Sequence, residues 1–145
     1  MKLEKTRTYL YAGIVLLILG FVNVYADAVI RISTLDDLKK IGTDSAFPLD
    51  GDYILAQDIN AAATSTMNNF KRIGDQEKPF TGSFDGQGYA ISGMDINLGG
   101  NSNLGFFGYT GSTARIMNLR LEKFNIYAGG NVGALVGYNG GGIDQ

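Results

Sequence analysis

The residues of this chain that could carry chemistry are its carboxylates, because its 145 residues include no histidine and no cysteine. The first absence removes the commonest general base near neutral pH, and the second removes thiolate metal ligands and disulfides. Paired carboxylates such as Asp85 and Asp95 could flank a glycosidic bond as acid and base. Asp50, Asp52 and Asp58, or Asp85 with turn carbonyls, could offer Ca²⁺ the oxygen ligands that it prefers.

Each of these carboxylates also fits a structural role. Asp-Gly sequences are typical of tight turns, and Asp50-Gly51-Asp52 lacks the EF-hand spacing. The glycine-rich stretch Asn139–Gly142 is followed by neither a Lys-Ser/Thr pair nor a helix start, so it is not a phosphate-binding loop. We therefore predict no catalytic residues, no cofactor-binding residues and no metal ligands, and a chain that is not an enzyme.

The N-terminal segment 1–26 has the layout of a signal peptide. Basic residues precede the apolar run Tyr9–Val22, and Val24 and Ala26 suit the −3 and −1 positions of a cleavage site. The alternative is an uncleaved membrane anchor over residues 9–25, since about 20 apolar residues span a bilayer. The whole chain carries a net charge of −2 and is more acidic without this basic segment, so it has no electrostatic case for binding nucleic acid.

A short helix is predicted directly after this segment, in ISTLDDLKKIG. Thr34 can cap the helix, and Asp37 follows at the N3 position, which is a capping-box arrangement. Leu35, Leu38 and Ile41 fall on one face, and a glycine follows as the stop signal. A helix of two turns is not stable alone, so we expect this apolar stripe to cover the first coil of the structure that follows.

The pattern then changes to short strands and tight turns. We expect a strand that places Tyr53, Leu55 and Gln57 on one side, after a turn at DGD. Two further strands, Phe80–Phe84 and Tyr89–Asn97, flank a turn at DGQG. The intervening segment 61–70 is small and polar, and it predicts a loop.

Two segments repeat an apolar phrase with glycines at its corners, GFFGY and GALVGY, and the offset between their Gly-Tyr pairs is 137 − 108 = 29. A second alignment, of AISGMDIN with RIMNLRLE, has an offset of 116 − 91 = 25, and Ile143 follows Ile116 at 143 − 116 = 27. Self-similarity at about 20 to 50 residues indicates a stacked architecture. The residues of the repeated motif are Gly105, Phe106, Phe107, Gly108, Tyr109, Gly133, Ala134, Leu135, Val136, Gly137 and Tyr138.

These repeats predict an all-β fold, a right-handed parallel β-helix with a short N-terminal capping helix, because the repeating units are strands with no helices between them. Equivalent side chains would then stack in the interior. We expect one ladder of Ile91, Ile116 and Ile143, and another of Phe106 with Leu135. An antiparallel sandwich is the competing architecture, since Asp-Gly turns between apolar strands also signal hairpins.

Two features concern surfaces that could bind partners. Tyr109 and Tyr138 could stack on sugars if they project outward, but we expect a packing ladder between coils.

We also expect the β-helix to be incomplete at its C-terminal end, with an exposed apolar end there. Solenoids need capped ends to stay soluble, so this uncapped end predicts self-association. The side chains at or near the exposed end would be Val132, Leu135, Val136 and Ile143.

The later part of the chain also resembles a known family. FTGSFDGQGYAISGMDIN and VGALVGYN are similar to sequences of the GLUG-motif family of bacterial and archaeal surface proteins, and the resemblance extends from about Tyr53 onward. ISTLDDLKKIG resembles the segment that often precedes the motif. The resemblance implies exported β-helical repeats of adhesin-like proteins, or the region ahead of the catalytic part in immunoglobulin-A-cleaving peptidases. It implies no catalytic residues. Related proteins usually continue for many more coils, whereas this sequence stops part-way through one.

We therefore divide the chain into a signal peptide or anchor (residues 1–26), a capping segment (27–45) and GLUG-type repeats (46–145). The predicted function is a non-catalytic module of a secreted or cell-surface adhesin-like protein. Its partners would be glycans or proteins of a host or cell surface, with membrane contact only through the N-terminal segment. The alternatives are a non-catalytic N-terminal region of a larger extracellular metalloprotease and a carbohydrate-active β-helix enzyme.

Cleavage of the signal peptide predicts a mature protein that begins at Asp27, or at Val29 if the second site is used. N-terminal sequencing of the exported protein checks this prediction. A product that still begins at Met1 would favour the membrane anchor.

Overall fold

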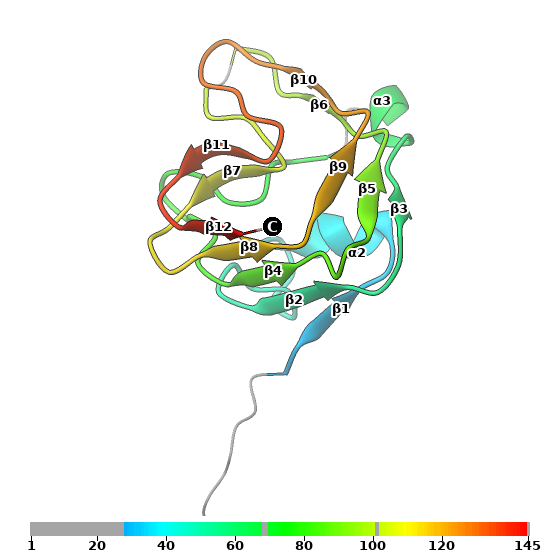
Figure 1. The fold of residues 1–145 in the computed structure, drawn as a ribbon. Coiled ribbons are helices and arrows are strands. Elements are labelled where there is room, and N and C mark those ends of the chain that lie inside the picture. The colour runs from blue at the N-terminus through cyan, green and yellow to red at the C-terminus, as the bar shows by residue number, and fades with distance from the viewer. Residues whose placement is uncertain (1–27, 68–69, 101, 145) are drawn as a thin grey trace, which may run out of the picture.

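The computed structural model describes residues 28–67, 70–100 and 102–144, so the predicted signal peptide lies outside the described residues. Strands predominate in the described part, and all of its strand pairs are parallel (Figure 1). The fold is therefore all-β with parallel sheets, and the alternative of an antiparallel sandwich is wrong. Neither helix within these residues is long and apolar enough to cross a membrane.

The described residues form four sheets. The five-stranded sheet contains β1 (Ile30–Ile32), β2 (Asp52–Leu55), β4 (Ser83–Asp85), β8 (Arg115–Met117) and β12 (Gly142–Asp144), in that order. The three-stranded sheet contains β3 (Ile59–Asn60), β5 (Ala90–Ser92) and β9 (Arg120–Glu122). The two-stranded sheets pair β6 (Asp95–Asn97) with β10 (Asn125–Tyr127), and β7 (Phe107–Thr110) with β11 (Val136–Asn139).

From β4 onward the chain visits these sheets in a fixed order and then repeats that order from β8, so β4–β7 and β8–β11 form two successive circuits (Figure 1). Each strand pairs with its equivalent one circuit later. The register places Ser83 beside Arg115 and Phe107 beside Val136. The offsets in residue number, 115 − 83 = 32 and 136 − 107 = 29, are similar. The circuits thus stack with nearly constant spacing along the sequence.

The predicted interior ladder is correct in one step and wrong in another. Ile116 lies beside Ile143 as expected, but its neighbour on the other side is Phe84. Ile91 lies beside Leu121 in a different sheet. The predicted match of Ile91 with Ile116 is therefore wrong, and the true offset of Ile91 to its equivalent is 121 − 91 = 30.

The error has a physical origin, because successive strands of one circuit use the same short phrase. AISG, RIMN and RLEK each contain a short strand with an apolar centre, followed by a corner residue with positive φ. The corner residues are Gly93 (φ 74°), Asn118 (φ 51°) and Lys123 (φ 55°). By sequence alone, AISG of β5 therefore matches RIMN of β8, which lies in another sheet, as well as it matches RLEK of β9, its partner in the structure.

Other predicted strands also differ in their limits. Tyr89–Asn97 is two strands, because the chain turns at Gly93 between β5 and β6. In Phe80–Phe84 the strand begins only at Ser83, although Phe80 forms an isolated bridge to Thr110. Gln57 is exposed rather than on the buried side with Leu55.

The predicted loop over residues 61–70 contains a short helix, α3 (Thr64–Met67). The hydroxyl of Thr64 accepts a hydrogen bond from the Asp95 backbone N–H at 2.8 Å and donates to the Ala61 carbonyl oxygen at 2.8 Å. Thr64 is fully buried, so these bonds satisfy a polar group inside the protein and hold α3 against β6.

The N-terminal helix α2 (Leu35–Lys40) forms as predicted, with both halves of the capping box. The Thr34 hydroxyl accepts from the Asp37 N–H at 3.1 Å, and the Asp37 carboxylate accepts from the Thr34 N–H at 3.1 Å. Leu38 and Ile41 are buried in the core cluster, and Leu35 packs against it. The helix therefore covers the core near β1, where its apolar stripe gains the contacts that two isolated turns lack.

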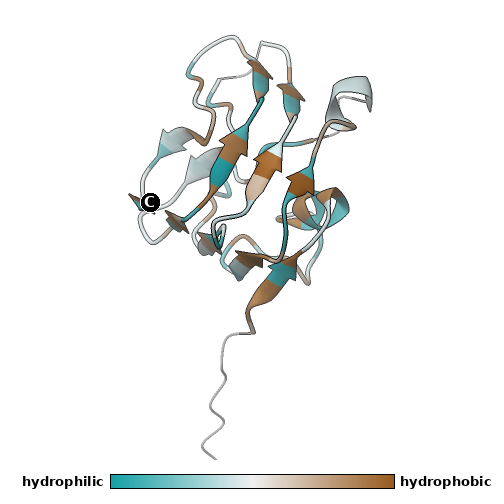
Figure 2. Ribbon diagram, turned by 45° about the vertical axis from the view of Figure 1, so that its right-hand side comes forward, coloured by the Kyte–Doolittle hydropathy of each residue, from teal (hydrophilic) through white to brown (hydrophobic). Residues whose placement is uncertain are grey.

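Aromatic rings fill the centre of the circuits. Phe106 and Phe107 lie edge to face with ring centroids 4.9 Å apart, and Phe84 contacts both rings. The brown segments in Figure 2 mark the hydrophobic residues of neighbouring strands. Ile116 is the last fully buried apolar residue of the described chain, and later ones such as Ile143 stay partly exposed.

Replacing Ile116 with Asp should prevent folding or lower the free energy of unfolding by several kcal/mol, because an unpaired charge would lie between Phe84 and Ile143. Ile116→Val should cost about 0.5–1.5 kcal/mol. Ile143→Asp is the matched control, since Ile143 lies in the same column but is 40% exposed. Urea unfolding measures all three, and an unchanged midpoint for Ile116→Asp would contradict the register.

Candidate functional site

The two repeated phrases form strands β7 and β11, which pair side by side. Phe107 lies beside Val136, and Tyr109 lies beside Tyr138. The backbone N–H of Phe107 donates to the Leu135 carbonyl oxygen at 2.8 Å. The register expected from the two Gly-Tyr pairs is therefore confirmed.

The two tyrosines stack on each other. The ring centroids of Tyr109 and Tyr138 are 4.4 Å apart with an interplanar angle of 21°, so the expected packing ladder between circuits is confirmed. Among the residues that the structure describes, Tyr138 is 50% exposed and Tyr109 is half-buried.

Glycines at the corners of the phrases allow the backbones of the two circuits to approach closely. A Cβ atom on Gly105 would lie 2.6 Å from the Gly133 carbonyl oxygen, and one on Gly137 would lie 2.3 Å from the carbonyl carbon of Asn103. A Cβ on Gly108 would lie 2.6 Å from the Gly74 carbonyl oxygen. Real Cβ atoms do not approach backbone atoms so closely, so any larger residue would push the circuits apart.

The remaining motif residues show how position along the stack changes burial. Phe106 and Phe107 are fully buried in the inner circuit, whereas Leu135 and Val136 are half-buried in the outer one. Ala134 is exposed. Val132 of the outer circuit is 51% exposed.

The carboxylates considered for chemistry have separate structural partners. Asp52 accepts a hydrogen bond from the Ser83 hydroxyl, and Asp58 accepts one from the Ala90 N–H at 2.8 Å. Asp50 lies in the turn before β2, as the turn interpretation predicts. The described residues contain no group of three or more acidic side chains that could hold a metal ion.

Asp85 holds the corner between β4 and β5. Its carboxylate accepts from the Gln87 N–H at 2.9 Å and from the Asn118 side-chain amide at 3.0 Å. Burial raises the pKa of Asp85, but these bonds and one from the Gln87 side chain outweigh it and hold the pKa below its ordinary value. A general acid needs a raised pKa, so this carboxyl group is poorly suited to protonate a leaving group.

Asp95, its suggested catalytic partner, lies on β6 in a different sheet. Asp85 lies on β4 in the five-stranded sheet, so the two carboxylates project from different sheets.

Polar side chains instead connect neighbouring circuits. The Thr110 hydroxyl donates to the Asn139 side chain at 2.8 Å, and the Asn131 amide donates to the Asn103 side chain at 3.0 Å. These partners lie 29 and 28 residues apart. Sequence analysis missed them, although the phrases NLG and NVG before the two motifs carry the Asn103–Asn131 signal.

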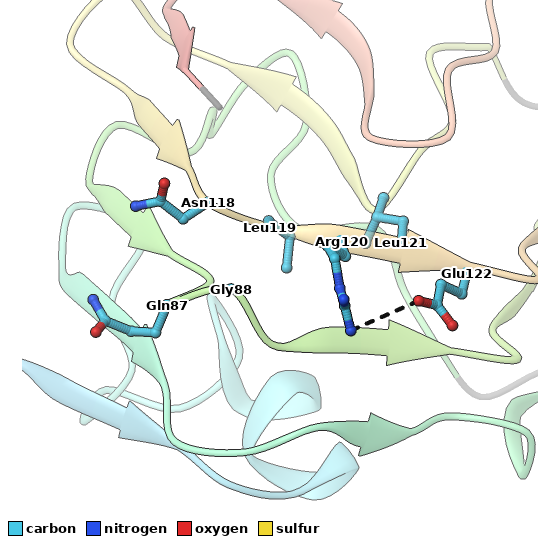
Figure 3. A pocket seen from close by; sticks show the side chains of 7 residues that line it. All are labelled: Gln87, Gly88, Asn118, Leu119, Arg120, Leu121 and Glu122. Carbon is cyan, nitrogen blue, oxygen red and sulfur yellow. Dashed lines mark ion pairs between the residues drawn. The ribbon is translucent and has the colours of Figure 1, made fainter.

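A groove of about 820 Å³ lies beside strand β9 (Figure 3). Gln87 and Gly88 of the corner loop line one side, and residues 118–122 line the other. Arg120 and Glu122 project there and form an ion pair at 3.8 Å. Both side chains are more than half exposed, so this pair is a weak contribution to stability.

Register, glycine contacts and polar connections together define a repetitive all-β chain whose circuits stack in parallel. No family model and no solved structure matches the sequence. The chain is 38% identical over 124 residues to halomucin of Haloquadratum walsbyi, covering 85% of this chain and 1% of halomucin. It is 37% identical over 98 residues to the "Putative Gly-rich membrane protein" of Evansella cellulosilytica, covering 64% of this chain and 11% of that protein. The similarity thus spans a small part of each relative.

Substituting Gly137 with Ala should lower the free energy of unfolding by about 1–3 kcal/mol, because the new Cβ would clash with the Asn103 backbone. Gly142→Ala is the matched control, since the nearest atom to its Cβ would be the Arg115 guanidinium at 3.7 Å. We expect the control to change stability by no more than about 0.5 kcal/mol. Equal effects of the two substitutions in thermal unfolding would contradict the proposed backbone contact.

Proposed function

We propose that this chain is a non-catalytic, exported repeat module of a cell-surface or secreted protein of the adhesin type. The observation that carries the proposal is that polar side chains of one circuit form hydrogen bonds with side chains of the next. Asp52, Asp85 and Asn103 each bond a side chain 28 to 33 residues away. Groups that could do chemistry are thus committed to holding one circuit against the next.

The proposal includes the architecture. We interpret the circuits as coils of a right-handed parallel β-helix, with α2 as its N-terminal cap. Parallel pairing in all four sheets supports this interpretation, and so does the similar sequence spacing of equivalent strands, as in the column of Phe84, Ile116 and Ile143. The chain would then belong to the GLUG-motif class that its sequence resembles, and the stacked GFFGY and GALVGY strands are the feature that supports this assignment.

A surface location is supported by the names of the relatives. One is a halomucin and the other is described as a Gly-rich membrane protein. In both, the similar region is a small fraction of the whole chain, which fits a module that occurs within long proteins. The predicted signal peptide of residues 1–26 would provide the route of export.

Labelling of intact cells tests this function. An antibody raised against the purified protein should bind intact cells of the native host or detect the protein in the culture medium, and permeabilising the cells should add little signal. Deleting residues 1–26 should confine the protein to the cytoplasm, with a known cytoplasmic protein as the control for leakage. Labelling of the natural protein only after permeabilisation would refute the proposal.

A further inference from the structure

A second pocket, of about 330 Å³, is lined by the connection from α2 to β2 and by the segment that precedes β4. Three cationic side chains line it, those of Lys71, Arg72 and Lys78. Apolar side chains contribute further lining: Ile41, Leu49 and Leu98. A few charged groups beside apolar surface, in a space of this volume, are typical of a pocket for a small molecule.

The three cations have no ion-pair partner among the described residues, whereas Lys39 and Lys40 pair with Asp36 and Asp37 on α2. The acidic residue of the lining is Asp75. Its carboxylate accepts hydrogen bonds from two backbone N–H groups of its own turn, at 3.0 and 2.8 Å. A concentration of unpaired positive charge in a chain of net charge −2 therefore favours an anionic ligand.

The segment that carries these cations is fixed at both ends on strand β7. The Ile73 N–H donates to the Phe106 carbonyl oxygen at 3.0 Å, and the Phe80 N–H donates to the Tyr109 carbonyl oxygen at 3.0 Å. Between these anchors the backbone turns at Asp75, whose N–H donates to the Lys78 carbonyl oxygen at 3.0 Å. The backbone of this wall is thus ordered before a ligand arrives, which lowers the entropic cost of binding.

Arg72 is positioned by a glycine of the repeated phrase. A Cβ atom on Gly108 would lie 2.2 Å from Cδ of Arg72, so the aliphatic stem of the arginine occupies the space above this glycine. The packed stem leaves the guanidinium group at the pocket, and a guanidinium group presents two parallel N–H donors to an oxyanion. Gly108 therefore serves the pocket as well as the stacking of circuits.

We propose that this pocket binds a sugar acid, with the carboxylate held by Arg72 and by the flanking Lys71 and Lys78. A bare inorganic anion would leave the apolar side chains Leu49 and Leu98 uncovered, whereas the ring attached to a carboxylate would cover them. The choice of an anion comes from the charges in the lining. The choice of a sugar as its carrier rests on the proposed surface function.

Titration of the purified full-length protein with D-galacturonate, followed by amide NMR signals, tests the site. The amide signals of Thr43 and Gly74 should shift in a saturable way, because both residues line the pocket. D-galactose, which lacks the carboxylate, and inorganic phosphate, which lacks the ring, should each bind at least about tenfold more weakly. Equal binding of galactose would overturn the role of the charges, and equal binding of phosphate would overturn the sugar acid as ligand.

Substitutions of Arg72 separate its charge from its shape. Arg72→Gln should raise the dissociation constant for galacturonate about tenfold or more, and Arg72→Lys should give an intermediate value because it keeps the charge but loses the paired donors. Arg31→Gln and Lys123→Gln are the matched controls, since both side chains are exposed and lie outside the lining. Circular dichroism checks that each variant is folded. Unchanged binding by folded Arg72→Gln, or equal losses in the controls, would refute the assignment.

An oligosaccharide of galacturonate identifies the source of the sugar acid. Binding at least as tight as that of the monosaccharide would assign the pocket to a unit within an acidic polysaccharide, and exclusion of the oligosaccharide would assign it to a free sugar acid. The location of the protein is decided separately by labelling intact cells. A surface protein that fails to bind galacturonate overturns this inference alone, and a protein that binds it but is labelled only after permeabilisation overturns the surface function alone.

Discussion

Parallel pairing between successive circuits sets the conditions that the rest of the molecule must meet, because it fixes each strand residue beside its equivalent in the next circuit. A side chain on one circuit therefore has to fit the same position on the next. Tyr109 and Tyr138 satisfy this by stacking, and Asn103 and Asn131 by hydrogen bonding. Where the backbones come closest, at Gly137, a side chain would not fit at all.

The same constraint explains why burial declines along the stack. An inner circuit is covered on both sides, so Phe106 and Phe107 lose all contact with solvent. In the part of the chain that the structure describes, the outer circuit is covered on one side, and the equivalent residues Leu135 and Val136 are half-buried. Near β1 the helix α2 contributes Leu38 and Ile41 to the buried core. Stability is therefore a property of neighbouring circuits together rather than of any one of them.

Structure could be predicted from the sequence where a motif acts within a few residues or occurs at only one place in each circuit. The capping box of α2 is a local signal and was predicted correctly. GFFGY and GALVGY gave the right register for β7 and β11, because a segment with apolar residues between a first glycine and a final Gly-Tyr occurs once in each of the two circuits. The register of Ile91 was wrong because its phrase recurs on successive faces of one circuit, and similarity alone cannot separate the two cases. The role of Asp85 was hidden for another reason, since its partner Asn118 is 33 residues away and neighbours it only once the circuits stack.

The corner after β4 shows how such a chain can change in length. Between the paired residues Asp85–Met117 and Ala90–Arg120 the inner circuit has a longer connection than the outer one, and the extra length lies in the exposed Gln87–Gly88 loop. The strands on either side remain paired despite the insertion. A single corner can therefore gain residues without disturbing the pairing of the strands on either side. The spacing between repeats in the sequence then varies, although the circuits still stack. A sequence search that assumes a constant repeat period would therefore miss a chain of this kind.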